Sequence, residues 1–174
     1  GGATVMTAAV DVTDEQALGR LVSEVRSRHG RITGVIHSAG VLDDNLLALR
    51  EPTVGSPVVD VKAKGALALE AVLADDPADL TVLFSSVSSL LGLPGQADYT
   101  AANAFLDAYA AHRNSFHGTR TVVVNWNAWQ EVGMAVEAAK VQPAHDHGIA
   151  DPIRLLDNVS DDDVSDPSPR VIER

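Results

Sequence analysis

The sequence predicts an α/β fold built on a doubly wound parallel sheet. Short apolar runs rich in Val, Ile and Leu alternate along the chain with segments of helical periodicity, and small or polar residues follow directly after several of the runs. Fully buried parallel strands read as apolar runs of this kind. Strands and helices that alternate are typical of a sheet whose strands are joined by right-handed helical crossovers.

Four apolar runs are predicted to be strands, and three segments between them are predicted to be helices. The strands are expected at residues 3–10, 32–39, 80–86 and 119–126, and the helices at residues 13–29, 58–74 and 98–112. The periodicity fades after Trp129. We therefore interpret residues 131–169 as a lid and an acidic loop, and residues 170–174 as a candidate final strand.

The helix boundaries follow from capping residues and glycines. Thr13 is the predicted N-cap of the first helix, and Gly30 closes that helix. Asp98 is the predicted N-cap of the third helix. Gly65 lies inside the second helix, where it either weakens the helix by about 1 kcal/mol relative to alanine or allows a neighbouring segment to pack closely.

The composition narrows the class of protein. A chain of 174 residues suits one domain, and 45% hydrophobic with 21% charged residues is typical of a globular protein. The formal net charge of −11 argues against a nucleic-acid surface, and no apolar run approaches the ~20 residues that span a bilayer. The absence of cysteine excludes disulfides, thiolate catalysis and zinc–thiolate sites.

The start of the chain carries two expectations. It resembles no signal peptide, so a cytoplasmic location is expected. It also lacks an initiating methionine, and we therefore interpret the chain as a piece of a longer polypeptide.

Four polar residues are expected to meet at one edge of the sheet, since ligands of doubly wound folds bind at the carboxyl ends of the strands. Ser86 ends the third strand, and Tyr99 opens the following helix. Asn103 lies one turn further on the same helical face, and Lys62 lies on the preceding helix. A hydroxyl, a phenol, a carboxamide and an ammonium could together hold and protonate a carbonyl oxygen during its reduction. A cation beside the phenol favours the phenolate and lowers its pKa from the reference value of about 10, and Lys62 is the candidate cation.

The segment "FSSVSSLLGLPGQADYTAANAFLDAY", residues 84–109, resembles the active-site segment of short-chain dehydrogenases/reductases. More narrowly, it resembles the ketoreductase domain of modular polyketide synthases. The Tyr-x-x-x-Asn spacing, the serine thirteen residues before the tyrosine and the Lys-x-x-Gly of "VKAKGA" match that family. "GVIHSAGVLDD" and "WNAWQEVGMA" match as well, so that the resemblance covers residues 11–135 and implies a Rossmann-like fold.

The resemblance implies a reductase that uses NADPH to reduce a β-ketoacyl thioester carried on an acyl carrier protein. It makes Tyr99 the proton donor to the ketone oxygen and Ser86 a hydrogen-bond donor to that oxygen. The resemblance implies that lysine and asparagine have exchanged positions relative to most members of the larger family. Lys62 then takes the role of the lysine that most relatives carry after the tyrosine, and Asn103 stands four residues after Tyr99. The cofactor-binding residues that it implies are Lys62, Tyr99, Asp11, Val12, Ser38, Ala39, Gly40, Trp126 and Asn127. For Trp126 a place in the core stays open.

The resemblance also implies the stereochemical type of the product. The "LDD" of residues 42–44 is the mark of B-type ketoreductases, and Leu91 stands where A-type enzymes carry tryptophan. The residues expected to orient the substrate are Leu42, Asp43, Asp44, Pro94 and Met134. Asp43 and Asp44 could equally cap a turn.

One part of the expected cofactor site is missing from the sequence. The pyrophosphate of a dinucleotide is normally held by a G-x-G-x-x-G loop after the first strand, and this chain has no such loop. Residues 3–10 would correspond to strand 3 and residues 32–39 to strand 4 of the order 3-2-1-4-5-6, so the fold is expected to lack strands 1 and 2 at its N-terminus. Residues 3–10 must then pair with the next strand, dangle, swap into another chain or await the missing segment.

Three functions stay open on the sequence. In the first, the chain is the carboxyl-terminal catalytic part of a ketoreductase that works beside its missing half and neighbouring synthase domains. In the second, it is a non-catalytic fragment or interaction module that cannot hold NADPH. In the third, it is a stand-alone short-chain carbonyl reductase. A glycine-rich βαβ segment directly upstream would favour the first. No metal site is expected, because the "HDH" of residues 145–147 lies in a loop without a clear further ligand.

Overall fold

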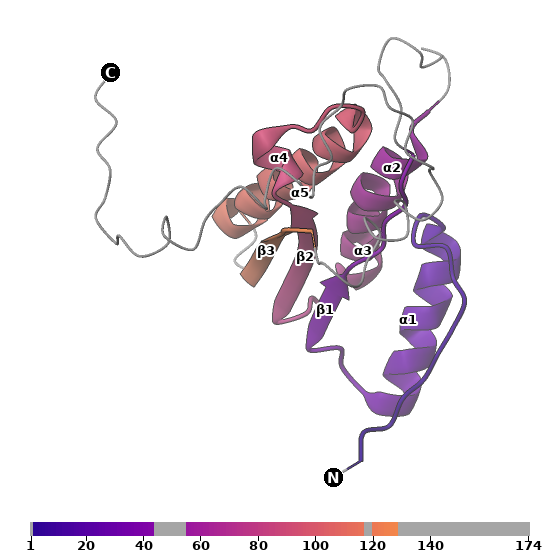
Figure 1. The fold of residues 1–174 in the computed structure, drawn as a ribbon. Coiled ribbons are helices and arrows are strands. Elements are labelled where there is room, and N and C mark those ends of the chain that lie inside the picture. Colours follow the sequence, from indigo (N-terminus) through magenta and orange to yellow (C-terminus); the bar gives the residue numbers. More distant parts are fainter. Residues whose placement is uncertain (1, 44–54, 117–119, 129–174) are drawn as a thin grey trace.

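A three-stranded parallel sheet lies at the centre of the molecule (Figure 1). The structure is a computed structural model that describes residues 2–43, 55–116 and 120–128. The strands β1 (Gly34–His37), β2 (Leu80–Ser86) and β3 (Arg120–Trp126) lie in the order β1-β2-β3, and both pairings are parallel. The predicted Rossmann-like α/β class with a parallel sheet is confirmed.

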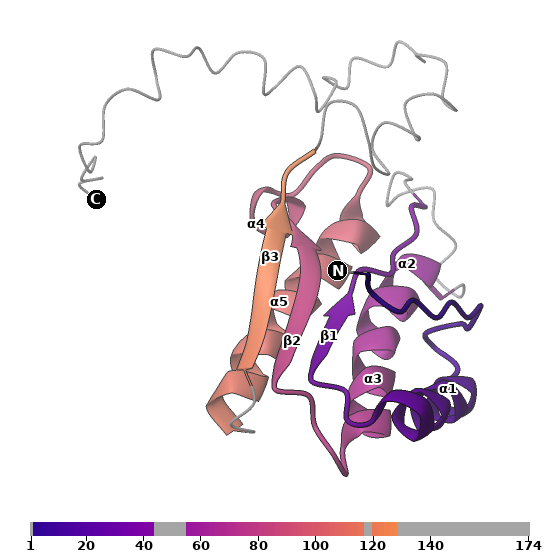
Figure 2. The same cartoon turned by 90° about the horizontal axis from the view of Figure 1, so that it is seen from below.

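Helices connect these strands on one side of the sheet. The described helical elements are α1 (Glu15–His29), α2 (Pro57–Val59), the π-helical turn η2 (Asp60–Lys64), α3 (Gly65–Leu73), α4 (Ser88–Leu91) and α5 (Ala97–Phe116). Because the strands follow one another in one direction, right-handed crossovers place α3 and α5 on the same face. Figure 2 shows α5 behind β2 and β3 and α3 beside β1, with α1 packed on α3. Within the described ranges, none of these helices has the length and apolar character that a bilayer requires.

The core lies between β2 and this helical layer. Leu83 of β2 and Leu106 of α5 are 1% and 0% exposed, and they form one apolar cluster with Ala66, Tyr109 and Ala110. Buried positions recur along α5 at three- and four-residue spacing, so one stripe of the helix faces the sheet. They are Ala102, Asn103, Leu106, Tyr109, Ala110 and Arg113.

The other face of the sheet is apolar and partly open. Alternation along each strand sends every second side chain to this face. By register the apolar side chains on this face are those of Ile36, Leu80, Val82, Phe84, Val122, Val124 and Trp126, and Ser86 and Arg120 are on it at the strand ends. Ile36 is 65% exposed, so the described residues cover this face incompletely.

The predicted strand at residues 3–10 is wrong, because residues 2–11 form no regular element. This segment is apolar, but a strand requires a neighbour that pairs with its N–H and C=O groups. In the described sheet β1 pairs with β2 alone, and residues 3–10 do not extend the sheet. Of the fates expected for this segment, the structure shows the unpaired one.

The other three predicted strands are confirmed, with different accuracy at their ends. β2 has the predicted bounds. β3 ends at Trp126 as predicted, and it begins at Arg120, next to the undescribed residue 119. β1 is shorter than the predicted 32–39, because only four residues find partners on β2.

Asp14, not the predicted Thr13, is the N-cap of α1. Oδ1 of Asp14 accepts a hydrogen bond from the backbone N–H of Ala17 at 2.9 Å. Thr13 is engaged outside the helix, where its N–H and its hydroxyl both donate to Oδ1 of Asp11 at 2.8 Å. Gly30 ends α1 with a φ of 81°, as its predicted role requires.

The helix α5 is longer at both ends than the predicted 98–112. It begins at Ala97, so Asp98 lies in its first turn and is not its N-cap. A turn precedes it, in which the N–H of Gln96 donates to the carbonyl of Leu93 at 3.1 Å. Pro94 and Gly95 occupy the centre of that turn, and Gly95 has a φ of 77°, as the third residue of a type II turn requires.

Gly65 allows a distant segment to pack against the helix that carries it. A Cβ on Gly65 would lie 2.9 Å from Cγ1 of Val12 and 3.1 Å from Cε1 of His37. The structure therefore supports the close-packing interpretation of this glycine. The predicted helix at residues 58–74 exists, but the π-helical turn η2 interrupts it just before Gly65.

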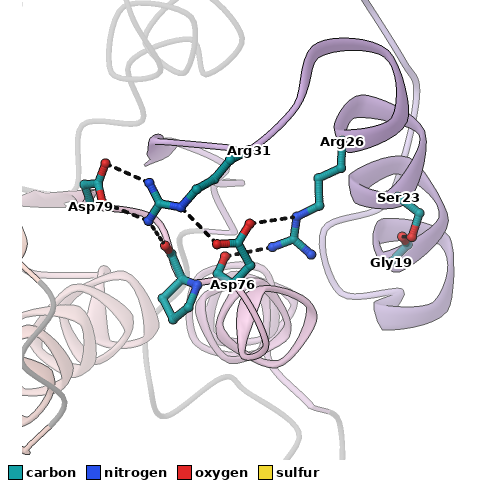
Figure 3. Close-up of polar contacts among 7 residues, drawn as sticks. Gly19, Ser23, Arg26, Arg31, Asp76 and Asp79 are labelled. Carbon is teal, nitrogen blue, oxygen red and sulfur yellow. Dashed lines mark hydrogen bonds and ion pairs between the residues drawn. The ribbon is translucent and has the colours of Figure 1, made fainter.

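Charged side chains join the loops at the amino edge of the sheet (Figure 3). Arg31 donates to Oδ1 of Asp76 at 2.9 Å and forms two hydrogen bonds with the carboxylate of Asp79 at 2.8 and 2.9 Å. Arg26 of α1 donates to the carbonyl of Asp76 at 2.8 Å. The hydrogen bond from Arg31 lowers the pKa of Asp79. These exposed pairs are screened by solvent, and they fix the loops that precede β1 and β2 more than they stabilise the fold.

Two glycine substitutions test the packing at Gly65. We expect Gly65→Ala to lower the free energy of unfolding by about 1–2 kcal/mol, because overpacking against Val12 and His37 outweighs the gain of about 1 kcal/mol in helix propensity. Gly19→Ala in α1 is the matched control, since its Cβ would meet Cγ1 of Val72 at an ordinary 3.7 Å. This control should gain up to about 1 kcal/mol. Urea unfolding of the full chain measures both, and an equal gain in both variants would contradict the close packing.

Candidate functional site

The carboxyl edge of the sheet carries the four polar residues that the sequence singles out. β2 ends at Ser86, and η2 carries Lys62. Tyr99 lies in the first turn of α5, with Asn103 one turn later. Contacts join Lys62 to Tyr99 and Tyr99 to Asn103, and Ser86 lies two residues beyond Phe84, which Lys62 contacts.

Lys62 is buried, with 3% of its surface exposed. Its Nζ donates a hydrogen bond to the carbonyl of Phe84 at 2.8 Å and lies 5.7 Å from the centre of the Tyr99 ring. An ammonium at this distance is attracted by the electron-rich face of the ring. Burial lowers the pKa of Lys62 to about 8, because desolvation penalises the charged form. Titratable groups perturbed in this way are enriched in functional sites.

Asn103 fastens the first turns of α5 to the sheet. It is fully buried, and its Nδ2 donates to the carbonyl of Tyr99 at 2.8 Å. Its own carbonyl accepts a hydrogen bond from the hydroxyl of Ser85 at 3.2 Å. Oδ1 of Asn103 is buried and has no hydrogen-bond partner among the described residues. An unpaired buried acceptor costs about 1–3 kcal/mol.

A polar network holds Ser86 in place. The hydroxyl oxygen of Ser86 accepts a hydrogen bond from the N–H of Ser88 at 3.2 Å, which leaves its own O–H to donate elsewhere. The carbonyl of Ser86 accepts from Nδ2 of Asn125 at 3.3 Å. The same Nδ2 lies 2.9 Å from Oγ of Ser89 and 3.0 Å from Oδ2 of Asp107. The network thus joins the ends of β2 and β3 to α4 and α5.

The residues expected to bind a nucleotide lie in separate segments. Residues 38–40 follow β1 directly at the carboxyl edge. Asp11 is exposed, and the hydrogen bonds that its carboxylate accepts from Thr13 lower its pKa. The side chain of Val12 packs against Gly65, and Gly65 lies three residues after Lys62 in the sequence. Asp11 and Val12 are therefore placed next to the helical segment that carries Lys62.

Trp126 and Asn127 lie at the end of β3. Trp126 packs edge-on against Phe84 with ring centres 5.3 Å apart, and it stands on the open face of the sheet with 37% of its surface exposed. It is therefore not part of the core between β2 and the helices. Asn127 is exposed, and its Oδ1 accepts a hydrogen bond from the N–H of Ala128 at 2.8 Å.

Three of the expected substrate-orienting residues lie in loops at this edge. Leu42 and Asp43 follow β1, and Pro94 lies in the turn before α5. Leu91, at the end of α4, is 72% exposed. The remaining predictions lie outside the described residues: Asp44, Met134, the lid and acidic loop of residues 131–169, and the histidines of residues 145–147.

Sequence reasoning missed four residues that support the site, which are His37, Ser85, Asp107 and Asn125. His37, Ser85 and Asn125 each make a buried or half-buried hydrogen bond with the backbone of Lys62, Asn103 or Ser86, and Asp107 accepts a hydrogen bond from Asn125. A signal was present, because Asn125 interrupts the apolar run of β3 and Asp107 lies four residues after Asn103. A polar residue on the buried side of a helix or strand needs a hydrogen-bond partner. The spacing of residues in the sequence does not predict which residue that partner is.

Chemically, the arrangement suits a reaction in which an oxygen atom gains a proton. Tyr99 offers an acidic O–H, Ser86 offers a second O–H, and Lys62 places a positive charge against the phenol ring. Hydrogen-bond donors that already point at the oxygen stabilise the alkoxide charge as it develops, and they do not have to reorient during the reaction.

Comparisons with known proteins agree with this arrangement. The model of the KR domain family matches residues 1–131. The polyketide synthase GfsB of Streptomyces halstedii is 45% identical over 138 residues, which are 79% of this chain and 2% of that protein. The ketoreductase from the first module of phoslactomycin biosynthesis in Streptomyces sp. HK803 superposes with a TM-score of 0.67 at 38% identity, over 73% of this chain and 29% of that one.

A structure described as A-type ketoreductases from a modular polyketide synthase is similar to the same degree. It has a TM-score of 0.66 at 42% identity and covers 73% of this chain. This chain spans 27% of that structure.

The burial of Lys62 predicts an unusual dependence of stability on pH. Its pKa is about 8 in the folded chain and about 10.5 when unfolded, so the unfolded chain binds more protons between these values. The free energy of unfolding should therefore rise through this window by about 3 kcal/mol, and Lys62→Met should remove the rise.

Urea unfolding at pH values from 7 to 11 measures this effect. Lys64→Met removes an exposed ammonium from the same turn and corrects for the loss of one charge. The same pH dependence in both variants would contradict the burial of the Lys62 ammonium.

Proposed function

The chain belongs to the KR domain family, the ketoreductases of polyketide synthases, and we propose on this basis that it performs the NADPH-dependent reduction of a β-ketoacyl thioester to the β-hydroxyacyl product. The observation that carries the proposal is the contact of the buried Lys62 with Tyr99 at the carboxyl edge. In the reaction the carbonyl carbon gains a hydride and the carbonyl oxygen gains a proton, while NADPH becomes NADP⁺.

Each polar residue has a distinct part in this proposal. Tyr99 donates its phenolic proton to the ketone oxygen, a contribution that is typically worth 10²–10⁴-fold in rate. Ser86 donates a hydrogen bond to the same oxygen and stabilises the charge that develops there. Lys62 stabilises the phenolate that Tyr99 leaves behind. Asn103 holds the backbone of Tyr99 in place through its 2.8 Å hydrogen bond.

The residues present fit one end of the cofactor. NADPH supplies the hydride when it is bound. Among the described residues, Nζ of Lys62 uses one of its three donors on Phe84, so a donor for a hydroxyl group of the cofactor is in place. Residues 38–40 would line the bound nucleotide, with Asp11 and Val12 towards its adenine and Trp126 and Asn127 at the nicotinamide end.

The proposed reaction belongs to a larger protein. The chain spans 29% of the phoslactomycin ketoreductase and 2% of the synthase GfsB, and its sequence contains no G-x-G-x-x-G loop. We therefore propose that the intact ketoreductase, beside its neighbouring synthase domains, acts on a substrate held by an acyl carrier protein in the cytoplasm. By themselves the 174 residues are expected to behave as the second candidate, a fragment that keeps the catalytic residues without a full cofactor site.

The two tyrosines of the chain provide a matched test of the reaction. In the intact ketoreductase that contains this chain, Tyr99→Phe should lower kcat for a β-ketoacyl N-acetylcysteamine thioester by about 10²–10⁴-fold, because the proton donor is lost. Tyr109→Phe removes the other phenol, which donates to Glu70 at 2.6 Å and lies in the core cluster. This control should change kcat little. NADPH oxidation is followed by absorbance.

Binding of NADPH, measured by calorimetry, separates the remaining outcomes. An intact protein that binds NADPH but reduces no ketone before or after substitution would refute the proposed reaction. Tight binding by the 174 residues alone would show that another segment replaces the phosphate loop. The stand-alone carbonyl reductase would then become the better hypothesis.

The stereochemical prediction has its own test. We propose a B-type product, and Leu91→Trp combined with deletion of residues 42–44 should shift the ratio of the two β-hydroxy products towards the opposite configuration. Leu90→Trp is the matched control, because Leu90 is the neighbouring residue of α4 and is 78% exposed. Chiral chromatography of the products measures the ratio. An unchanged ratio in the Leu91 variant would count against the B-type assignment.

A further inference from the structure

Lys62 lies in a single π-helical turn, η2, between α2 and α3. Such turns are rare and concentrate at functional sites, because the wider turn redirects a side chain at some cost in backbone hydrogen bonding. The position of the Lys62 side chain therefore depends on whatever holds this turn against the sheet.

The imidazole of His37 makes that contact. His37 is the last residue of β1 and is 3% exposed. Its Nε2 lies 3.1 Å from the carbonyl oxygen of Lys62. A carbonyl oxygen can only accept, so Nε2 must carry the hydrogen that donates to it. Burial lowers the pKa of His37 and so favours the neutral ring, and the hydrogen bond to the carbonyl places the proton of that ring on Nε2.

The surrounding packing leaves this ring little room. A Cβ on Gly65 would lie 3.1 Å from Cε1 of His37, and Val12 closes the same space. The N–H of Gly65 also bonds to the carbonyl of Lys62, so this carbonyl accepts from the helix and from the sheet at once. The imidazole is thus fixed between β1, η2 and the segment before α1.

The two ends of Lys62 are held by neighbouring strands. His37 of β1 holds its carbonyl, and Phe84 of β2 accepts a hydrogen bond from its Nζ at 2.8 Å. His37 pairs in register with Leu83, the residue before Phe84. The two attachment points therefore lie one residue apart along the carboxyl edge of one rigid sheet.

We propose that His37 is a positioning residue for Lys62, whose Nε2–H holds the main chain of η2 so that the ammonium reaches Phe84 and the ring of Tyr99. This inference rests on the proposed reductase function and assigns it a residue outside the reacting groups. His37 touches the backbone of Lys62 and acts on the reaction only through that residue.

Two substitutions separate the donor from simple packing. His37→Met fills the space without a donor, and His37→Gln keeps an N–H donor on a chain of suitable length. In the intact ketoreductase, His37→Met should lower kcat at saturating NADPH and substrate at least tenfold. It should also raise the titration midpoint of Lys62 by about one pH unit, as the ammonium gains solvent. His37→Gln should keep both kcat and the titration midpoint of Lys62 close to their wild-type values.

The readouts are NADPH oxidation and NMR titration of the Lys62 side chain, with Lys64 as the reference for a lysine in the same turn. A His37→Met protein with wild-type kcat and wild-type Lys62 titration would overturn the proposal, even with lowered stability. So would a His37→Gln protein that behaves like His37→Met.

Two controls keep the test independent of folding and of the reaction. Nitrogen NMR of the wild-type protein reports which ring nitrogen of His37 carries the proton, and a proton on Nδ1 alone would overturn the proposal without any variant. If the wild-type protein reduces no ketone, the proposed function fails, while the Lys62 titration in the variants still decides the role of His37.

Discussion

The burial of one ammonium group organises the carboxyl edge of the sheet. Lys62 is 3% exposed, and its lowered pKa shows that its contacts do not fully offset the cost of leaving water. Stability alone would favour an apolar residue at this position. Instead the surroundings are arranged around Nζ, with a widened helical turn beneath it, the carbonyl of Phe84 at 2.8 Å and the ring of Tyr99 at 5.7 Å.

The topology explains why these groups can meet at all. Three parallel strands follow one another in one direction, so right-handed crossovers bring α3 and α5 to the same face. The turn η2 before α3, the end of β2 and the start of α5 then reach one edge. The opposite face keeps an apolar surface that includes Ile36 and Trp126. A doubly wound fold has helices on both faces, and the described residues supply those of one face only.

How far the sequence could predict this depended on whether a feature was local. The apolar runs predicted β2 to the residue, and helical spacing placed Tyr99 and Asn103 on one face. The strand at residues 3–10 failed, because a strand needs a partner that its own sequence does not supply. The cap at Thr13 failed because Asp11 competes for its hydroxyl. The turn η2 and the contact of His37 with Lys62 depend on residues 25 positions apart, which no periodicity reports.

The two edges of the sheet solve different physical problems. At the amino edge, Arg26 and Arg31 join the loops through Asp76 and Asp79, and the exposed pairs of Arg31 tolerate solvent and contribute little to stability. Seven buried side-chain atoms have no hydrogen-bond partner in the described part of the chain. Three are nitrogen or oxygen atoms of Arg26, Arg113 and Thr121, and the other four are oxygens of Ser88, Thr100, Asn103 and Asp107 near the carboxyl edge. The latter four residues lie on α4 or the first three turns of α5. Unsatisfied groups are tolerated only where the surrounding structure fixes them. The apolar cluster around Leu83 and Leu106 provides that support, because Leu106 anchors α5 against β2 beyond the turns that carry Tyr99 and Asn103.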